Sequence, residues 1–203
     1  MDKPFYELIA IGGSAGSFRI VRALLKDLPA GFPIPLVVVM HVWKQSYGMI
    51  AEMLNTNSAL TVEEAEEKCV PAAGHVYLAP GNYHLLLERD ASFGLMVDPP
   101  VNYSRPSIDV FFESASAALG RALVGVLLTG ANSDGALGMK RIGEAGGLTI
   151  VQDPSTAEAS FMPAAALQAV QANHIVQPES LAPLLLQVST YSESCHGNGS
   201  GKS

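Results

Sequence analysis

Residues 7–17 of the chain read ELIAIGGSAGS, an apolar run of strand length that ends in a Gly-x-Ser-x-Gly turn. A segment with apolar side chains at helical spacing follows the turn. A serine in a sharp turn between a strand and a helix presents its hydroxyl above the edge of a sheet, as in a nucleophile elbow. Gly12 and Gly16 permit such a turn because neither residue carries a Cβ. Ser14 is therefore the candidate nucleophile.

The same turn does not fit a dinucleotide-binding loop. Counted from Gly12, the second and third glycines of a Gly-x-Gly-x-x-Gly pattern would fall on Ser14 and Ser17. The second strand of such a site should close with an acidic residue, whereas the apolar run 36–40 is followed by His41. The Gly-x-x-x-x-Gly-Lys-Ser/Thr pattern of a phosphate loop does not occur either. We therefore expect chemistry at Ser14 rather than a nucleotide site.

Two further polar residues follow predicted strands, at the sheet edge where open α/β folds place their chemistry. His41 would lie beside Ser14, whose hydroxyl needs a base to take its proton. Asp134 comes after the apolar run 123–128, where a carboxylate can orient His41 and stabilise its imidazolium. Simpler alternatives are a loop histidine that caps a helix and an acid favoured by a helix N-terminus. The coincidence of all three residues at strand ends favours a Ser-His-Asp arrangement.

Eight short motifs then occur in a fixed order along the chain. They are IAIGGSAG (9–16), VMH (39–41), GHVYLAP (74–80), RPSID (105–109), LLTGANSDG (127–135), EAGG (144–147), QD (152–153) and MP (162–163). On these motifs the chain resembles the catalytic domain of the chemotaxis protein-glutamate methylesterases, the CheB family. The resemblance implies a Ser14–His41–Asp134 triad on a doubly wound, mostly parallel sheet, with no cofactor or metal. It also implies hydrolysis of glutamyl methyl esters on chemoreceptors, and deamidation of receptor glutamines.

The resemblance extends to residues around the triad. Backbone N–H groups near Ala15 and Ala131 are expected to bind the oxyanion. Arg105 is expected near the cleft, in contact with substrate carbonyls or carboxylates, although a surface cation is an equal alternative. Met162 is expected in the wall of the substrate pocket. The methylated chemoreceptor would be the partner protein, with a separate regulator or a methyltransferase as further partners.

The chain departs from the family pattern at four positions around this site. Ser17 and Phe161 stand where the family usually has glycine, and Ala131 and Asn132 replace a Met-Gly pair. These changes keep two alternatives open. One is a non-catalytic binding module of the same fold that docks onto a receptor, a methyltransferase or a kinase. The other is a hydrolase of small-molecule esters or amides.

Strands and helices alternate as in βαβ units, which predicts an α/β fold with a mostly parallel sheet flanked by helices. The middle differs, because residues 73–82 and 84–88 surround a Pro-Gly-Asn turn and predict an antiparallel hairpin, to which 93–97 adds a strand. The acidic residues 63–67 are predicted to form a solvated face. The other expected strands are 7–12, 35–41, 122–129, 147–152 and 174–177, and the expected helices are 17–28, 46–56, 107–120, 134–145, 162–172 and 179–189.

Other polar and aromatic residues have competing interpretations. Asp109 could replace Asp134 as the triad acid, but it is expected in the first turn of helix 107–120, where a carboxylate is favoured. Trp43 and Tyr47 would line the mouth of the cleft or pack beside a helix start. His75 and His84 lack a nearby third ligand for a metal. We therefore expect no metal site.

The length and composition bound the remaining possibilities. The chain has 203 residues, of which 48% are hydrophobic, enough to bury a core. A net charge of −7 disfavours nucleic acid or an anionic membrane as partner. No apolar stretch approaches the ~20 residues of a membrane span, and no signal peptide pattern is present, so no membrane insertion is expected. Two cysteines, Cys69 and Cys195, form no zinc or redox motif, which favours a cytoplasmic location.

The domain organisation is predicted to be simple. The esterase-like strand begins within about ten residues of Met1, so no receiver domain is expected before it, unlike in the best-known family members. Residues 1–190 are predicted to form the catalytic domain. Residues 191–203, rich in Ser and Gly, are predicted to form a disordered tail.

Overall fold

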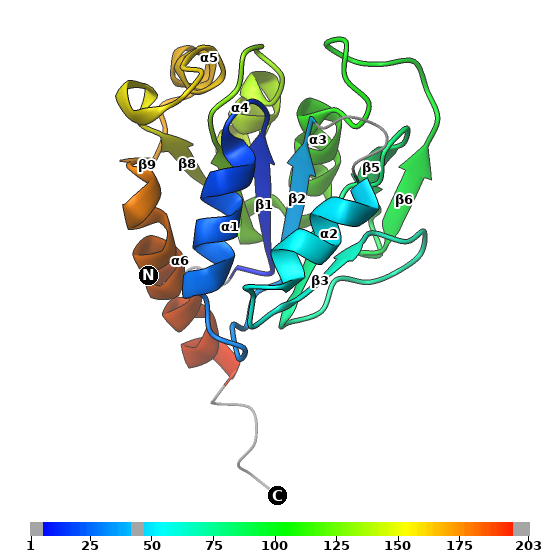
Figure 1. Cartoon of the computed structure of the whole chain (residues 1–203), viewed down its shortest axis with the longest axis vertical. Coiled ribbons are helices and arrows are strands. Elements are labelled where there is room, and N and C mark those ends of the chain that lie inside the picture. Colours follow the sequence, from blue (N-terminus) through cyan, green and yellow to red (C-terminus); the bar gives the residue numbers. More distant parts are fainter. Residues whose placement is uncertain (1–5, 42–46, 197–203) are drawn as a thin grey trace, which may run out of the picture.

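The computed structural model describes residues 6–41 and 47–196. Within them, seven strands form one parallel sheet with helices on both faces (Figure 1). The strands of this sheet are β1 (Leu8–Gly13), β2 (Leu36–Met40), β3 (Thr61–Glu64), β4 (His75–Leu78), β7 (Leu123–Leu127), β8 (Leu148–Gln152) and β9 (His174–Val176). The helices are α1 (Ser17–Asp27), α2 (Tyr47–Asn55), α3 (Ile108–Leu119), α4 (Ala136–Glu144), α5 (Phe161–Ala169) and α6 (Pro178–His196). Two 3₁₀ turns occupy Gly120–Ala122 and Pro154–Thr156.

The spatial order of the strands is β3-β4-β2-β1-β7-β8-β9. The chain therefore winds outward from β1 in one direction and later outward from β7 in the other. This confirms the predicted doubly wound sheet. Open sheets of this kind place their ligands where the strand order reverses, outside the carboxyl ends of the strands. That point lies between β1 and β7, at the upper edge of the sheet in Figure 1.

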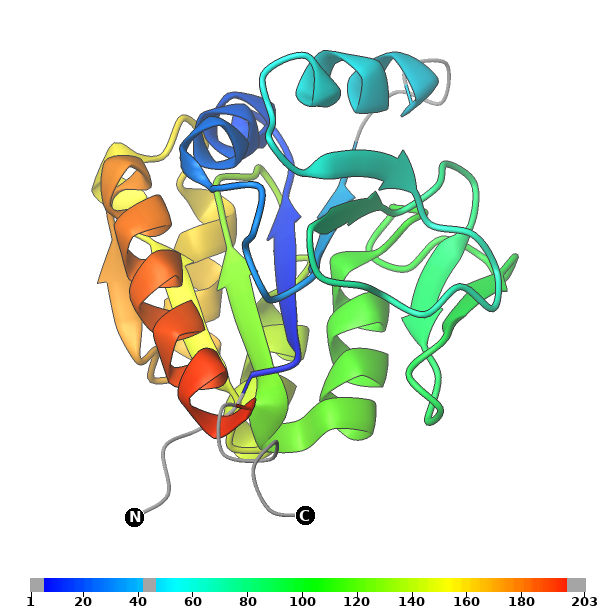
Figure 2. The same ribbon diagram turned by 90° about the horizontal axis from the view of Figure 1, so that it is seen from below.

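Two hydrophobic cores cover the two faces of the sheet. One core joins the sheet to α1, α2 and α6, with Leu24 and Leu185 among its buried side chains. The other joins it to α3, α4 and α5, with Phe112 and Met139. Figure 2 shows α1 and α2 on one side of the strands and α3 on the other. β1 and β2 are buried along their whole length, which explains why they read as unbroken apolar runs.

The hairpin prediction was partly correct: the strand predicted at 93–97 does pair with the one at 84–88, but the strand within 73–82 does not. The antiparallel pair is β5 (His84–Leu87) with β6 (Phe93–Met96), and it packs on α3. β4 belongs instead to the main sheet, where it runs parallel to both β2 and β3. The error arose because the Pro-Gly-Asn turn between β4 and β5 looks like a hairpin turn. The two flanking strands nevertheless belong to different sheets.

β3 was not predicted as a strand. Its residues alternate around a single buried side chain, Val62, with Thr61, Glu63 and Glu64 exposed. The exposed glutamates agree with the solvated face that was predicted. The one buried position is too short a signal to mark an edge strand.

The last helix, α6, continues to His196. The boundary predicted at residue 190 falls inside this helix, and residues 197–203 lie outside the described residues. Trp43 also lies outside them, and Tyr47 begins α2. Among the described helices, none is long and apolar enough to cross a membrane.

Candidate active site

Ser14 and His41 occupy corresponding positions at the ends of neighbouring strands. Gly13 of β1 pairs with Met40 of β2 in the parallel register, and Ser14 and His41 are the next residues along. The N–H of His41 donates to the carbonyl of Gly13 at 3.3 Å, which ties the two strand ends together. On the other side of β1, the N–H of Ser14 donates to the carbonyl of Thr129 at 2.9 Å. The three predicted strand ends therefore meet at one edge of the sheet.

The turn that carries Ser14 is held in a tight shape. Gly16 has a φ of +83°, in the left-handed region that glycine adopts without strain. Both the N–H and the hydroxyl of Ser17 donate to the carbonyl of Ser14, at 3.0 and 2.7 Å. A Cβ on Gly13 would lie 2.5 Å from the Cβ of Ser17, so the strand and α1 approach as closely as glycine allows. Ser14 itself is half-buried at the start of this turn.

His41 and Asp134 are in direct contact. The Nε2 atom of His41 lies 2.8 Å from Oδ2 of Asp134. The His41 side chain is 13% exposed, and the Asp134 side chain is fully buried. The pair therefore joins a partly open imidazole to a carboxylate shielded from water, in the turn between β7 and α4. Since Nε2 faces the carboxylate, Nδ1 is the second ring nitrogen left for another partner.

Asp134 accepts hydrogen bonds from the start of α3 and from the loop before it. The hydroxyl of Ser107 and the N–H of Asp109 donate to Oδ1, at 2.8 and 3.1 Å. The N–H of Ile108 donates to Oδ2 at 2.8 Å, and the side-chain amide of Asn102 donates to Oδ1 at 3.1 Å. A buried carboxylate with this many donors is held in one orientation.

These contacts decide the charge of Asp134. Burial alone would raise its pKa, but the hydrogen bonds from His41, Ile108, Asn102 and Ser107 outweigh burial and lower the pKa below its usual value. The group is therefore ionised at neutral pH, where a negative charge beside His41 stabilises a developing imidazolium.

Asp109 lies beside this carboxylate in a different environment. It is in the first turn of α3, as predicted, and it is 6% exposed. Its Oδ1 accepts from the N–H of Gly138 at 2.7 Å, and its Oδ2 accepts from Asn102 at 2.9 Å. Burial raises the pKa of Asp109 to about 6, and the charge of Asp134 adds to the effect. The contact with His41 is made by Asp134, so Asp134 is the better candidate for the triad acid.

The backbone amides of Ala15 and Ala131 lie in the turns that follow β1 and β7. Within the described residues, the N–H groups of Ala15 and Ala131 donate no hydrogen bond, and both residues are exposed. The two turns that carry these amides are linked, because the hydroxyl of Thr129 donates to the carbonyl of Ala15 at 2.9 Å. The N–H of Thr129 in turn donates to Oε1 of Gln152 at 2.8 Å. The arrangement can offer donors to an oxyanion from two fixed turns.

Met162 packs against the turn that carries Ala131. Its side chain is fully buried, and its N–H donates to the carbonyl of Gly130 at 2.9 Å. A Cβ on Gly130 would lie 2.4 Å from the methyl carbon of Met162, so the turn rests directly on this side chain. The preceding residue, Phe161, is 61% exposed at the start of α5. Of these two neighbours, Phe161 is therefore the one open to a ligand.

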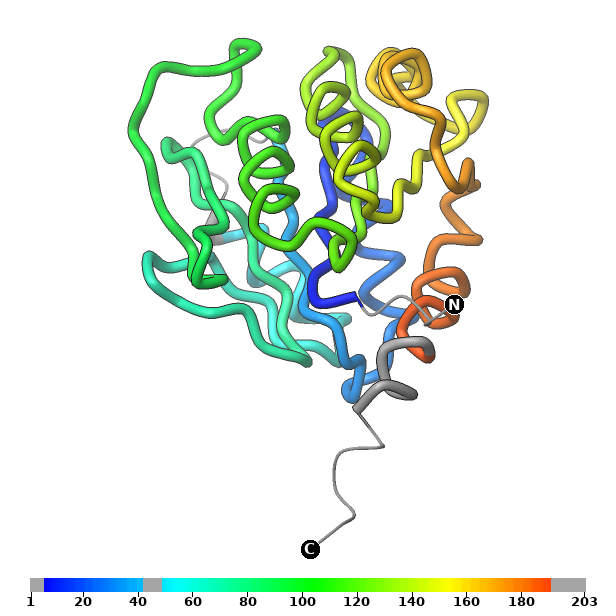
Figure 3. The backbone as a smooth tube through the Cα atoms, turned by 180° about the vertical axis from the view of Figure 1, so that it is seen from behind, coloured from blue at the N-terminus to red at the C-terminus, as the bar shows by residue number. Residues whose placement is uncertain are grey.

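Arg105 lies in the loop between β6 and α3. One of its terminal nitrogens donates to the carbonyls of Val97 and Asp98, at 2.9 and 3.0 Å. The guanidinium thus braces its own loop. The loop stands out at the same end of the molecule as α5 and the start of α4 when seen from behind (Figure 3).

The departures from the family pattern are accommodated without backbone strain. Ser17 is buried and uses its hydroxyl within the turn, as described above. Asn132 does not have a left-handed φ, and its side-chain oxygen accepts from the N–H of Asp134 at 3.2 Å. The replacement of glycine at residue 132 therefore needs no unusual conformation.

Several residues of this site were missed from the sequence. Ser107 directly precedes α3 and donates to Asp134, and a serine before a helix is a recognisable capping signal. Gln152 was seen only as part of a motif, although it ends a strand beside β7. Asn102 carried no local signal, because it lies in an irregular loop that only the folded chain brings to the triad. Among the described residues, no group of three side chains could hold a metal ion.

Comparisons with known proteins agree with this geometry. The family model described as CheB methylesterase matches residues 9–185. A Leptospira interrogans protein, provisionally named protein-glutamate methylesterase/protein-glutamine glutaminase, is 46% identical over 183 residues, covering 90% of this chain and 95% of that protein. A Hydrogenovibrio crunogenus protein named protein-glutamate methylesterase/protein-glutamine glutaminase is 38% identical over 188 residues, covering 91% of this chain but 50% of the relative.

A solved structure shares the fold. The CheB methylesterase catalytic domain of Thermotoga maritima superposes with a TM-score of 0.86 at 30% identity, covering 90% of this chain and 98% of that domain. The identity and the coverage go beyond a likeness of fold, and the family model spans most of the chain. The chain belongs to the CheB methylesterase family.

Proposed function

We propose that the chain is a serine hydrolase that removes methyl esters from glutamyl side chains of chemoreceptor-like proteins, and that it also deamidates glutamines. The observation that carries the proposal is the contact between His41 and a buried, ionised Asp134, at the strand end next to Ser14. The names of the relatives support the substrate class. Ser14, His41 and Asp134 form the catalytic triad of this proposal.

Acylation would begin with transfer of the Ser14 proton to Nδ1 of His41, because Nε2 is engaged by Asp134. The serine oxygen attacks the ester carbonyl, and the N–H groups of Ala15 and Ala131 bind the oxyanion. The tetrahedral intermediate then collapses with cleavage of the bond to the methoxy group. His41 returns its proton to this group, and methanol leaves.

Deacylation repeats the sequence with water. His41 takes a proton from water, the hydroxide attacks the acyl-enzyme, and the bond to Ser14 breaks as His41 protonates the serine oxygen. The products are the free glutamate and the original enzyme. For a glutamine substrate, ammonia leaves in the first step in place of methanol.

The surrounding residues have supporting roles in this proposal. Met162 fixes the turn that carries Ala131, so it shapes the pocket through that turn. Arg105 holds the loop before α3 with one nitrogen, which leaves the rest of its guanidinium for substrate carbonyls or carboxylates. The catalytic domain extends at least to the end of α6 at His196. The partners are a methylated receptor and a separate regulator or methyltransferase, in the cytoplasm.

The test is release of methanol from receptor-like peptides that carry a glutamyl methyl ester. We expect wild-type turnover to fall by about 10⁴-fold or more in Ser14→Ala, as in other serine triads. Ser180→Ala is the matched control, because this exposed serine lies on α6 outside the proposed site. Near-wild-type turnover in Ser14→Ala would overturn the mechanism. A folded wild-type protein that binds the peptide without hydrolysing it would favour the non-catalytic module.

A further inference from the structure

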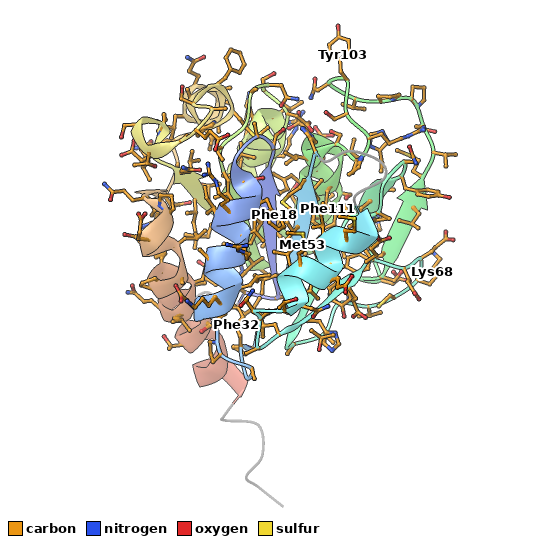
Figure 4. The ribbon with its side chains drawn as sticks, viewed as in Figure 1. Phe18, Phe32, Met53, Lys68, Tyr103 and Phe111 are labelled. Carbon is orange, nitrogen blue, oxygen red and sulfur yellow. The ribbon has the colours of Figure 1, made fainter. Side chains whose placement is uncertain are left out.

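One side chain of the loop between β6 and α3, that of Asn102, forms a hydrogen bond with Asp134. Asn102 lies in this loop with a φ of +50°, a left-handed conformation in which asparagine is among the tolerated residues. The residue is exposed, yet its side-chain amide reaches Asp109 and Asp134. The neighbouring residue Tyr103 has a φ of +63° and points into solvent, at the top of the molecule in Figure 4. The two adjacent residues therefore share a left-handed conformation, but the side chain of Asn102 bonds to two buried carboxylates whereas that of Tyr103 is fully exposed.

The amide of Asn102 joins two buried carboxylates. Its Nδ2 lies 2.9 Å from Oδ2 of Asp109 and 3.1 Å from Oδ1 of Asp134. An amide nitrogen carries two hydrogens, so it can donate one to each carboxylate. Two buried carboxylates repel each other when both are ionised, and a donor placed between them offsets part of that repulsion. Among the residues that the structure describes, Asn102 is the side chain that donates a hydrogen bond to both.

Further hydrogen bonds hold the rest of this loop in place and so keep Asn102 next to the two carboxylates. The buried His84 accepts from the N–H of Ser107 at 3.2 Å through Nδ1, and its Nε2 lies 3.1 Å from the carbonyl of Pro99. Val101 and Ser104 form a small antiparallel bridge around the tip. Both ends of the loop are thus anchored beside the start of α3, from which Asp134 also receives its backbone donors.

We infer that Asn102 is a positioning residue of the triad, which holds Asp134 in the orientation that His41 requires by linking it to Asp109. The inference rests on the proposed function of Ser14, His41 and Asp134, and it deepens that function. Asn102 acts through Asp134 and not on the substrate. Its loss should therefore slow the chemical steps and leave substrate binding in place.

The experiment compares Asn102→Gly with Tyr103→Gly. Both positions have positive φ, so glycine fits each without strain, and both changes loosen the same loop. Only the first removes the amide. We expect kcat on an ester peptide, and the rate at which a fluorophosphonate labels Ser14, to fall about 10- to 100-fold in Asn102→Gly, the effect of losing a hydrogen bond to a charged group. KM should stay within about twofold, and Tyr103→Gly should keep the wild-type kcat.

Asn102→Asp separates the donor from the shape of the loop. Aspartate tolerates the same φ and has nearly the same shape, but it would bring a third carboxylate towards Asp109 and Asp134. We expect it to be at least as impaired as Asn102→Gly. Wild-type kcat in either Asn102 variant, or an equal loss in Tyr103→Gly, would overturn the inference.

A measurement without substrate keeps this inference separate from the proposed function. The carboxyl carbon of Asp109, followed by NMR, should titrate at a higher pH in Asn102→Gly than in the wild type, because the ionised form loses a donor. An unchanged midpoint would refute the bridge between the carboxylates, whether or not the protein is an esterase. Failure of Ser14 labelling in a folded wild type would instead refute the proposed function.

Discussion

Asp109 and Asp134 show how two neighbouring carboxylates acquire different properties. Asp134 receives donors from His41, from Asn102 and from the start of α3, and these outweigh the effect of burial on its pKa. Asp109 has fewer donors and lies beside a negative charge, so burial prevails and raises its pKa. Catalytic sites commonly hold two carboxylates whose environments move their pKa values apart. Here it marks Asp134 as the carboxylate that stays charged next to His41.

The raised pKa of Asp109 predicts a pH-dependent stability. Its folded pKa of about 6 lies above the ordinary aspartate pKa of 3.8, so the folded state binds this proton more tightly than the unfolded chain. The favourable contribution is present below about pH 4 and is lost as the pH rises through 6. At 1.36 kcal/mol for each pKa unit, the loss is about 3 kcal/mol. Asp109→Asn should remove this dependence.

Urea unfolding between pH 4 and pH 7 provides the measurement. The free energy of unfolding of the wild type, minus that of Asp109→Asn, should fall by about 2.5 kcal/mol across this range, most of the full loss of about 3 kcal/mol. Asp90→Asn is the control, because Asp90 is exposed and hydrogen bonds from Ser92 lower its pKa, which places its titration below this range. Parallel pH profiles for the wild type and Asp109→Asn would contradict the environment described for Asp109.

At the scale of the elements, the strand-to-helix turn after β1 depends on Gly16. Alanine at this left-handed position costs about 1–2 kcal/mol, and its Cβ would lie 2.9 Å from the Cβ of Glu158. Gly16→Ala should therefore lower the free energy of unfolding by about that amount and also reduce esterase activity, because the turn that presents Ser14 must shift.

Gly31→Ala is the matched control for this turn. A Cβ at Gly31 would meet no atom within 4 Å, and its φ is not left-handed. We expect its stability to be unchanged or raised by about 0.4–1 kcal/mol. Urea midpoints of the two variants decide the matter. Equal stability of Gly16→Ala and the wild type would show that the turn is not constrained as described.

The sequence predicted the elements whose burial is uniform and failed where pairing is non-local. β1, β2 and β7 are buried on both faces, so each is an unbroken apolar run that a local pattern detects. The partner of β4 depends on which strand lies beside it in the sheet, and a turn next to it in sequence is a poor guide. β3 was missed because an edge strand with one buried residue has almost no periodic signal.

The same distinction between regular elements and non-local contacts explains which residues of the site could be predicted. Ser14 and His41 could be predicted because each directly follows a strand, and Asp134 because it lies in the turn that follows β7; parallel strands bring their carboxyl ends together. Asn102 was missed because its contact with Asp134 spans 32 residues and starts from an irregular loop. The spacing of residues in the sequence predicts helices and strands, but it does not predict which distant residues the side chains of an irregular loop will contact.

For the molecule as a whole, one sheet joins the two cores into a single unit. Leu185 of α6 and Phe112 of α3 are fully buried on opposite faces of the sheet. Leu185→Ala should lower the free energy of unfolding by about 2–5 kcal/mol, and Phe112→Ala by about 3–5 kcal/mol. Each variant should still unfold in one cooperative transition, because neither core can persist without the shared strands.

The measurement is urea unfolding followed by far-UV and near-UV circular dichroism. Coincident transitions in the wild type and in both variants are expected. Leu184, on the same helix as Leu185 but only partly buried, offers a milder comparison when changed to alanine. Separate transitions, with one core lost before the other, would contradict a single folding unit.

The central claim is that Ser14 is a nucleophile activated by His41, and covalent labelling tests it most directly. A fluorophosphonate reacts with an activated serine without any need to know the natural substrate, and mass spectrometry then identifies the modified residue. We expect labelling of Ser14 in the wild type, no labelling at that position in Ser14→Ala, and a strongly reduced rate in His41→Ala. A folded wild-type protein that stays unlabelled, or a label that persists undiminished in Ser14→Ala, would contradict the account.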